Sequence, residues 1–459
     1  MAGLDIALNT GVRSLLTRQK EMATTGQNLA NAEKPGYHKR TTKVQTTPSI
    51  ETVNARIGTG VQVEKVTRAY DTILESNLQQ AVNKDGYHQK YAAMLKYAED
   101  VIAPDGESSL QTAITDFANA WQDVASQPES TEHRKNLIER GKRVAEELNL
   151  TNSRIDGAKN RIWDQSANTG YLVEAVNSAN RKAEEIATLN KRISQFERRQ
   201  FNDQQANELR DQRDKLLNEL SRLTDITVKE QEHGVKTVQL DGRDWIGNGE
   251  VHDSLEAAAD GAGGVELKWT SGGTVSQDGG ETEGYIESYG VLNNLEAEFE
   301  TFATTMRDEL NSQHASGYDL DDNLGTDLFQ DTADGWQFQI SDARKIAASS
   351  EQNAPGNGEN AQAMWDRMHD TAVFGGNDNI SNYVDRRVDD LATEVQNAQE
   401  LAKGTEGQVE MLEKEIQSKS GVNSDEEMRD MLETQRAYQA SSRFVTVVDE
   451  MLASAIRMV

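Results

Sequence analysis

Apolar residues recur at seven-residue spacing at both ends of the chain, and we call the two sets together the assembly seam. The N-terminal set is Leu8, Leu15, Met22 and Leu29 at this spacing, together with Leu4, which lies four residues before Leu8. The C-terminal set is Met431, Tyr438, Val445, Leu452 and Val459. This spacing is typical of helices that pair in coiled-coil fashion, so it predicts a helix at each end of the chain.

Each terminal helix needs a partner, because an unprotected terminal helix frays. The other chain end is the obvious candidate, which predicts a terminal coiled coil made from both ends. For the N-terminal helix, packing on its own domain is the alternative interpretation. At the other end, Ser424 followed three residues later by Glu427 predicts a capping box that starts the C-terminal helix.

Behind the N-terminal helix the pattern changes twice. Pro35 and Gly36 predict its end, since proline favours an extended residue before it and cannot continue a helix. Alternating apolar and polar residues from Arg40 to Val66 then predict strands. A helical pattern resumes near Tyr70 and continues past Leu95.

The central region, residues 131–224, contains no proline and again repeats apolar residues every seven positions. The repeats are Leu148, Ile155 and Ile162, then Leu172, Ala179, Ile186 and Ile193, then Leu209, Leu216 and Leu223. Charged residues fill the other positions, including the run at 208–215. This pattern predicts long helices with narrow apolar seams and solvated charged faces, arranged as a rod-like bundle.

The composition changes at Asp225, where short alternating runs and many glycines predict a small β-rich insert. Helical spacing returns at Leu292, the run at 336–340 predicts a strand, and a helix is expected from Val384 towards Ile416. The predicted fold class is therefore mainly α, a long helical bundle with a terminal coiled coil and a small β-rich insert domain.

These changes divide the chain into three expected domains. Residues 1–50 with 418–459 form the terminal axial coiled coil, and residues 51–225 with 284–417 form the helical rod. Residues 226–283 form the outer insert, which is expected to project outward because insertions are tolerated on exposed surfaces.

Composition excludes several classes of function. Of 459 residues, 48 are Lys or Arg and 77 are Asp or Glu, giving a net charge of -29. Binding to nucleic acid or to an anionic membrane surface rests on surplus positive charge, so neither is expected. The chain contains no cysteine, which excludes disulfides and thiolate metal sites. No apolar run approaches the roughly 20 residues of a membrane span, and no Sec-type signal is expected at the start.

Candidate catalytic chemistry is weak. The sequence shows no phosphate-binding loop, dinucleotide motif, nucleophile elbow or paired metal histidines, so we predict no enzyme, no cofactor and no metal site. The seven histidines are expected at the surface. Asp319, Asp321 and Asn323 have the first spacings of a calcium loop, but Leu324 and Gln330 stand where that loop needs glycine and glutamate. A solvated acidic turn is the preferred interpretation, and whether it binds any cation stays open.

One short motif does indicate a family. Asn28 and Asn31 are followed by Lys34-Pro35-Gly36-Tyr37. This stretch resembles the N-x-x-N and T-P-G-Y signature of bacterial flagellar rod, hook and hook-associated proteins. Lys34 replaces the usual threonine. We call Asn28, Asn31, Pro35, Gly36 and Tyr37 the axial-protein motif.

Four longer segments make the resemblance more specific. Residues 125–149, 206–242, 307–329 and 420–452 are similar, in matching order, to successive regions of the flagellar hook-associated protein 1 family. The chain is short for that family, which implies one small outer domain instead of two.

The resemblance implies a structural protein at the junction between flagellar hook and filament, self-assembling into a ring-like layer through its terminal helices. It implies an extracellular location, reached through type III export without a cleaved signal peptide. The implied partners are the hook protein, the second hook–filament junction protein and a cytoplasmic export chaperone on the C-terminal helix. Another axial protein, such as a hook or distal rod subunit, is the alternative, and a secreted enzyme on a coiled-coil stalk is a more distant one.

Overall fold

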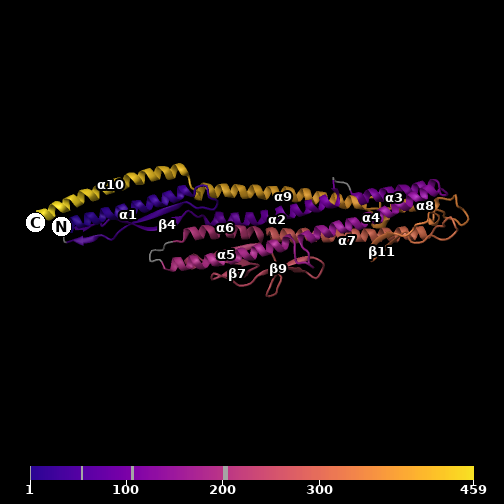
Figure 1. The fold of residues 1–459 in the computed structure, drawn as a ribbon, viewed down its shortest axis with the longest axis horizontal. Coiled ribbons are helices and arrows are strands. Elements are labelled where there is room, and N and C mark those ends of the chain that lie inside the picture. The colour runs from indigo at the N-terminus through magenta and orange to yellow at the C-terminus, as the bar shows by residue number, and fades with distance from the viewer. Residues whose placement is uncertain (1, 53–54, 105–107, 200–204, 459) are drawn as a thin grey trace.

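Long helices and short antiparallel hairpins build the computed structural model, which describes residues 2–52, 55–104, 108–199 and 205–458. The helices are α1 (Ala2–Ala30), α2 (Thr72–Ile102), α3 (Ser109–Ser126), α4 (Thr131–Ile162), α5 (Tyr171–Arg199), α6 (Asn207–Leu223), α7 (Gly280–Ala315), α8 (Glu359–Met368), α9 (Tyr383–Ser420) and α10 (Ser424–Arg457). The predicted mainly α class is confirmed. Figure 1 shows an elongated molecule with both chain ends at the same end.

The strands form small antiparallel sheets. They are β1 (Arg40–Thr46), β2 (Ile50–Thr52), β3 (Ala55–Ile57), β4 (Val61–Arg68), β5 (Ile226–Glu230), β6 (Lys236–Leu240), β7 (Arg243–Gly247), β8 (Glu250–Val251), β9 (Leu255–Ala259), β10 (Val265–Trp269), β11 (Phe329–Thr332) and β12 (Gly335–Phe338). Strand β1 pairs with β4, and β5 to β8 form one sheet in sequence order. The predicted strands at both places are confirmed.

We define the terminal unit as residues 2–68 together with residues 421–458. Helix α1 lies between the β1–β4 hairpin on one side and α10 on the other (Figure 1). Thr17 and Thr24 are buried on the hairpin side of α1, where Thr42 donates a hydrogen bond to Thr24 at 3.0 Å. The chain passes from the terminal unit to the rest of the molecule only at residues 69–71 and at the α9–α10 corner.

Helices α2 to α9 form the rod, whose core runs along its length. Helix α2 packs against α7 and α9, and α3 packs against α4. The predicted seams of α4 and α5 are buried, including Leu148, Ile155 and Ile186. Aromatic side chains thicken the core at the far end, where Phe117 contacts Trp121 and Phe329 edge-on. The rod core is therefore wider than the narrow seams predict.

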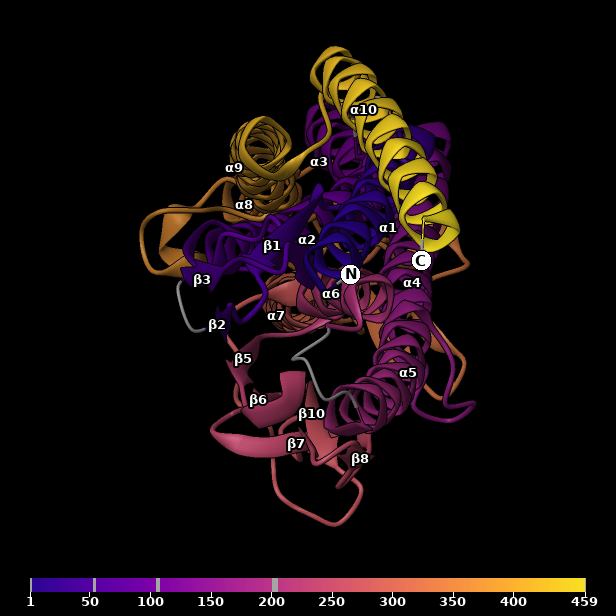
Figure 2. The same cartoon turned by 90° about the vertical axis from the view of Figure 1, so that its left-hand side faces the viewer.

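The outer domain, strands β5 to β10, lies on the side of the rod away from α10 (Figure 2). Trp245 is fully buried and meets Trp269 edge-on at a ring separation of 6.0 Å. These side chains belong to the same apolar core as the rod. The domain leaves and rejoins the rod at neighbouring points, because the Thr282 hydroxyl donates to the carbonyl of Leu223 at 2.9 Å.

Three local predictions need correction. Helix α7 begins at Gly280, a full twelve residues before the expected return at Leu292. The strand predicted at 336–340 ends at Phe338. The cap of α10 is Asn423, whose side chain accepts hydrogen bonds from the backbone of Asp425 and Glu426. Ser424 is thus the first helical residue and not the cap. Glu427 does not close a capping box, because its carboxylate binds Asn28 and Lys39.

Candidate assembly site at the terminal helices

The two terminal helices pair antiparallel. The Ser14 and Ser441 hydroxyls lie 3.0 Å apart, and nearer the rod Asn28 donates to Glu427 at 2.9 Å. Nearer the chain ends, Gly11 of α1 allows α10 to approach closely. A Cβ atom added at Gly11 would lie only 2.7 Å from Cγ2 of Val445. The missing side chain therefore lets the helices touch.

The assembly seam lies on the faces where the two helices meet. Val445 lies beside Gly11, and Met431 lies beside Gly26. Tyr438 and Leu452 are seven residues from Val445 and share its face. The residues of the seam are half-buried in the structure, apart from Tyr438 at 36% exposure, while Val459 lies outside the described residues. The seam therefore forms a contact within the chain, and its role between copies stays a prediction.

A second apolar stripe on α10 escaped the sequence analysis. We call Phe444, Val447, Met451 and Met458 the outer stripe. They follow one another at three, four and seven residues and are 47% to 81% exposed. On α1, Val12 and Leu16 are similarly exposed, Leu16 at 61%. The spacing of three, four and seven residues is the sequence signal for the outer stripe, and it is less regular than the seven-residue repeat of the seam.

Asn28 of the axial-protein motif joins three segments of the terminal unit. Its amide nitrogen donates to the Arg40 carbonyl and to the Glu427 carboxylate, each at 2.9 Å. Its amide oxygen accepts from the Arg40 backbone and from the Tyr37 hydroxyl. Both donors and both acceptors of this buried side chain are thus satisfied, which makes it a fixed corner between α1, β1 and α10.

The rest of the motif turns the chain at the end of α1. The backbone nitrogen of Tyr37 donates to the carbonyl of Lys34 at 3.2 Å, closing a four-residue turn. Pro35 presets the first central position, and Gly36 takes the second with φ of 75°. Asn31 donates to the carbonyl of Gln27 and closes the last turn of α1. The turn places the next residue, His38, against the rod.

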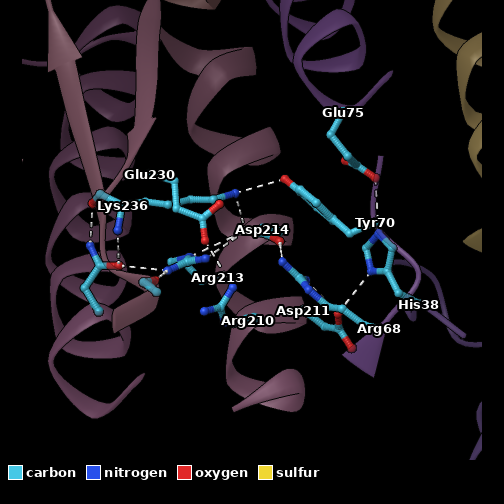
Figure 3. Close-up of polar contacts among 12 residues, drawn as sticks. His38, Arg68, Tyr70, Glu75, Arg210, Asp211, Arg213, Asp214, Glu230 and Lys236 are labelled. Atoms are coloured by element: carbon cyan, nitrogen blue, oxygen red, sulfur yellow. Dashed lines mark hydrogen bonds and ion pairs between the residues drawn. The ribbon is translucent and has the colours of Figure 1, made fainter. Parts of the chain in front are cut away.

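His38 binds the rod through both ring nitrogens (Figure 3). Nδ1 lies 3.0 Å from Asp211 of α6, and Nε2 lies 3.1 Å from Glu75 of α2. Burial opposes the charged ring, but hydrogen bonds to Asp211 and Glu75 outweigh it and raise the pKa of His38 to about 9. Tyr70 packs against the ring at a centroid separation of 5.5 Å, and Arg68 also binds Asp211, at 2.9 Å. His38 is therefore a charged clamp between two carboxylates.

Deeper in the same cluster, Asp214 of α6 holds three cations (Figure 3). Its Oδ2 lies 2.5 Å from Arg68 of β4, and its Oδ1 lies 2.9 Å from Lys236 of β6. Arg213 approaches Oδ1 at 3.5 Å. Burial alone would raise the pKa of Asp214, but Arg68, Lys236 and Arg213 outweigh it and lower the pKa well below its usual range.

This cluster corrects the interpretation of residues 208–215 as a solvated charged face. Arg210, Asp211, Arg213 and Asp214 are all buried. The buried face of α6 continues through Leu217 and Leu220, whereas Leu209 and Leu216 of the predicted seam are only half-buried. Asp211 and Asp214 occupy core positions of α6 because β4 and β6 bring cations to them, and Arg210 is paired with Glu197 of α5.

Two of the seven histidines are also buried, against expectation. His38 is 5% exposed for the reason given above, and His314 is fully buried. His314 lies 2.6 Å from the Thr326 carbonyl and accepts from the Ala347 backbone at 2.8 Å. Burial lowers the pKa of His314 to about 4, so it packs as a neutral ring.

The acidic turn at Asp319 is likewise less solvated than expected. Asp319 is buried, and its Oδ1 accepts from the backbone of Asp321 and Asn323 at 2.7 and 3.0 Å. Lys345 lies 3.2 Å from its Oδ2. Within the described residues no group of three His, Asp or Glu side chains is placed to hold a metal ion. None of the helices among the described residues is long and apolar enough to cross a membrane.

The His38 clamp predicts a stability that falls at alkaline pH. The folded-state pKa of about 9 lies above the ordinary 6.5, so the contribution is complete below pH 6.5 and is lost as pH rises through 9. This difference between the two pKa values corresponds to at most roughly 3 kcal/mol of folding stability. Urea unfolding followed between these pH values is expected to show the loss. His38→Gln should flatten this part of the profile, and an unchanged slope would contradict the clamp.

Comparison with known proteins identifies the architecture. Residues 95–329, about half of the chain, match the helical domain of flagellar hook-associated protein FlgK. The chain belongs to the flagellar hook-associated protein 1 (FlgK) family. Residues 415–458 also match the C-terminal segment of the flagellar basal body rod proteins FlgEFG. The terminal helix is therefore of a kind found in basal body rod proteins, while residues 95–329 carry the match to the FlgK helical domain.

Relatives in two bacteria support the same assignment. Flagellar hook-associated protein 1 of Bacillus subtilis is 27% identical over 99% of this chain and 98% of its own length. The Salmonella typhimurium protein of the same name is 26% identical, over 70% of this chain and 59% of its own length. The flagellar hook junction protein FlgK of Burkholderia pseudomallei shares the fold, with a TM-score of 0.63 at 13% identity over 74% of this chain and 99% of that one.

Family membership establishes the general function. Members are structural components of the bacterial flagellum and not enzymes, so this chain is a structural flagellar protein of the hook-associated class. The buried polar clusters described above are therefore structural joints and not catalytic centres.

Proposed function

We propose that the chain forms the junction between flagellar hook and filament and assembles into a ring-like layer through its terminal helices. The observation that carries the proposal is the outer stripe. Four apolar side chains of α10, with Leu16 and Val12 on α1, are exposed at helical spacing on the unit that carries both chain ends. A solvent-exposed apolar stripe at coiled-coil spacing is stabilised when another helix covers it.

The charge distribution supports contact between copies. Residues 1–68 hold ten Lys and Arg but only five Asp and Glu, although the chain as a whole is strongly acidic. Lys43 and Lys65 stand directly opposite each other in the β1–β4 hairpin, and like charges in that position repel. An acidic surface of a neighbouring copy relieves this repulsion. The acidic excess of the remaining chain supplies such surfaces.

The neighbours in this proposal are the hook protein on one side and the second hook–filament junction protein on the other. Export follows the flagellar type III route without a cleaved signal peptide, with a cytoplasmic chaperone covering the C-terminal helix until export. The outer stripe supports binding of the chaperone to this helix, because an exposed apolar helix face is prone to aggregate before assembly. The expected three-domain division, into residues 1–50 with 418–459, residues 51–225 with 284–417 and residues 226–283, belongs to the same proposal, with the insert projecting outward.

A hook or distal rod subunit is the remaining alternative. The match over residues 415–458 is compatible with it, since rod proteins share that segment. The match of residues 95–329 to the FlgK helical domain favours the hook-associated class instead.

Deletion of the gene tests the junction role. Cells are expected to retain complete hooks, to lack filaments and to release monomeric flagellin into the medium, and the intact gene should restore filaments. Electron microscopy of isolated hooks and immunoblots of the medium provide the measurement. Filaments on the deletion strain would exclude the junction role. Basal bodies without hooks would indicate a rod or hook subunit.

A further inference from the structure

The terminal unit is seated on the rod by polar contacts. Within the described residues, neither cluster of buried apolar side chains extends into the terminal unit, since none of their members lies in residues 2–68 or 421–458. The α9–α10 corner adds one backbone hydrogen bond, from Lys39 to the carbonyl of Ser420 at 2.8 Å. Because no apolar core connects the two parts, the terminal unit is held on the rod by polar contacts: the His38 clamp and the charged cluster around Asp214.

Lys236 of the outer domain enters this cluster and reaches Asp214. Lys236 of β6 is 4% exposed and directs its ammonium group towards the joint (Figure 3). It donates to the Asp214 carboxylate and to the Tyr70 hydroxyl, each at 2.9 Å. Tyr70 lies in the short crossing between β4 and α2. Lys236 therefore contacts both the carboxylate that holds the terminal unit and the crossing that connects it.

Asp214 links the two domains through its two oxygens. Oδ2 binds Arg68, the last residue of β4 in the terminal unit, while Oδ1 binds Lys236. The Arg68 guanidinium also stacks over the Tyr70 ring at 4.3 Å from its centroid, with the Lys236 ammonium 5.0 Å from the same centroid. Arg68 and Lys236 therefore share two partners, and the position of either one depends on the other.

We infer that the outer β domain fixes the orientation of the terminal unit on the rod, with Lys236 as the positioning residue. Without the lysine, Asp214 Oδ1 and the Tyr70 hydroxyl each lose a buried partner. Arg68 then loses the constraint on two of its partners, Asp214 and Tyr70, and keeps its ion pair with Asp211. The terminal unit then pivots about residues 69–71 and the α9–α10 corner. Buried polar networks of this kind specify one geometry more than they add stability. The inference concerns the isolated chain and does not depend on the junction role.

The absence of cysteine makes a direct test practical. Gln408→Cys on α9 and Gln435→Cys on α10 place two spin labels at exposed positions on either side of the corner. In dilute monomer, pulsed electron paramagnetic resonance measures the distance between the two labels. For the otherwise unchanged chain it is expected to give one narrow distance distribution. Adding Lys236→Met is expected to abolish the single narrow population and produce a broad one, although the substitution lies in the outer domain.

Lys229→Met is the matched control, because Lys229 is an exposed lysine on β5 of the same sheet. It should leave the narrow distribution unchanged. A wild-type distribution in a folded Lys236→Met chain would overturn the inference, as would equal broadening by Lys229→Met.

Tyr70→Phe decides the question if Lys236→Met fails to fold. It removes only the hydroxyl that Lys236 contacts and leaves the stacked ring in place. A broader distance distribution for this variant supports the inference, and an unchanged one overturns it.

Discussion

Replacing Asp214 with asparagine is expected to destabilise the folded chain by roughly 3–5 kcal/mol, among the largest single-site effects in the molecule. The amide keeps the volume of the carboxylate but removes its charge. Arg68, Arg213 and Lys236 would then remain buried beside a neutral group that satisfies fewer of their donors. Urea unfolding followed by circular dichroism is expected to show a clearly lower midpoint.

Glu208→Gln on the same helix is the control for this experiment. Glu208 is exposed, and neutralising an exposed carboxylate generally changes stability by less than about 0.5 kcal/mol. An Asp214→Asn chain that unfolds at the midpoint of the Glu208→Gln chain would show that the three cations find other partners. The cluster would then contribute little to the stability of the chain.

The helices could be predicted because their signal is local. The spacing of seven at Leu8 and Leu15, and at Val445 and Leu452, records which side of each helix is covered, whatever covers it. The same holds for the outer strands, where alternation and glycine-rich turns mark the sheet. Within α1 and α10 the sequence therefore predicts both the element and its covered face.

The charged joint could not be predicted in this way. Arg68, Asp214 and Lys236 come from three distant parts of the sequence, and each looks like an ordinary surface charge beside its own neighbours. Burial becomes favourable only when β4 and β6 arrive at α6 with opposite charges. One local signal did exist, because Arg210 and Asp214 occupy the positions that lead in helical spacing to Leu217 and Leu220. A charge in an apolar register indicates a buried partner.

The axial-protein motif lies between these two cases. Pro35 and Gly36 specify a turn by their own conformational preferences, so the end of α1 could be predicted from them. The role of Asn28 could not, since its partners Arg40, Tyr37 and Glu427 meet only when α10 returns along α1. The motif resembles a signature of flagellar axial proteins, and the structure supplies a physical reason for its polar residue Asn28.

Met451→Asp is expected to abolish assembly while leaving the isolated chain folded. Met451 is 53% exposed on the outer stripe, so the charge remains solvated in the monomer and its melting temperature should hardly change. In the proposed layer the same position is covered by a neighbouring copy. Burying an unpaired carboxylate there costs of order 2–4 kcal/mol for every copy, which prevents a stable ring.

Two substitutions at neighbouring positions distinguish the effect of a charge on the outer stripe from its effect elsewhere on α10. Ala453→Asp adds the same charge at an exposed position outside the stripe and should preserve swimming. Leu452→Asp places the charge on the half-buried face towards α1 and should lower the melting temperature of the isolated chain itself. Swimming assays and filament counts in a deletion strain carrying each variant provide the comparison. Normal filaments with Met451→Asp would show that the outer stripe faces solvent in the flagellum, and the self-assembly surface would then lie elsewhere on the terminal unit.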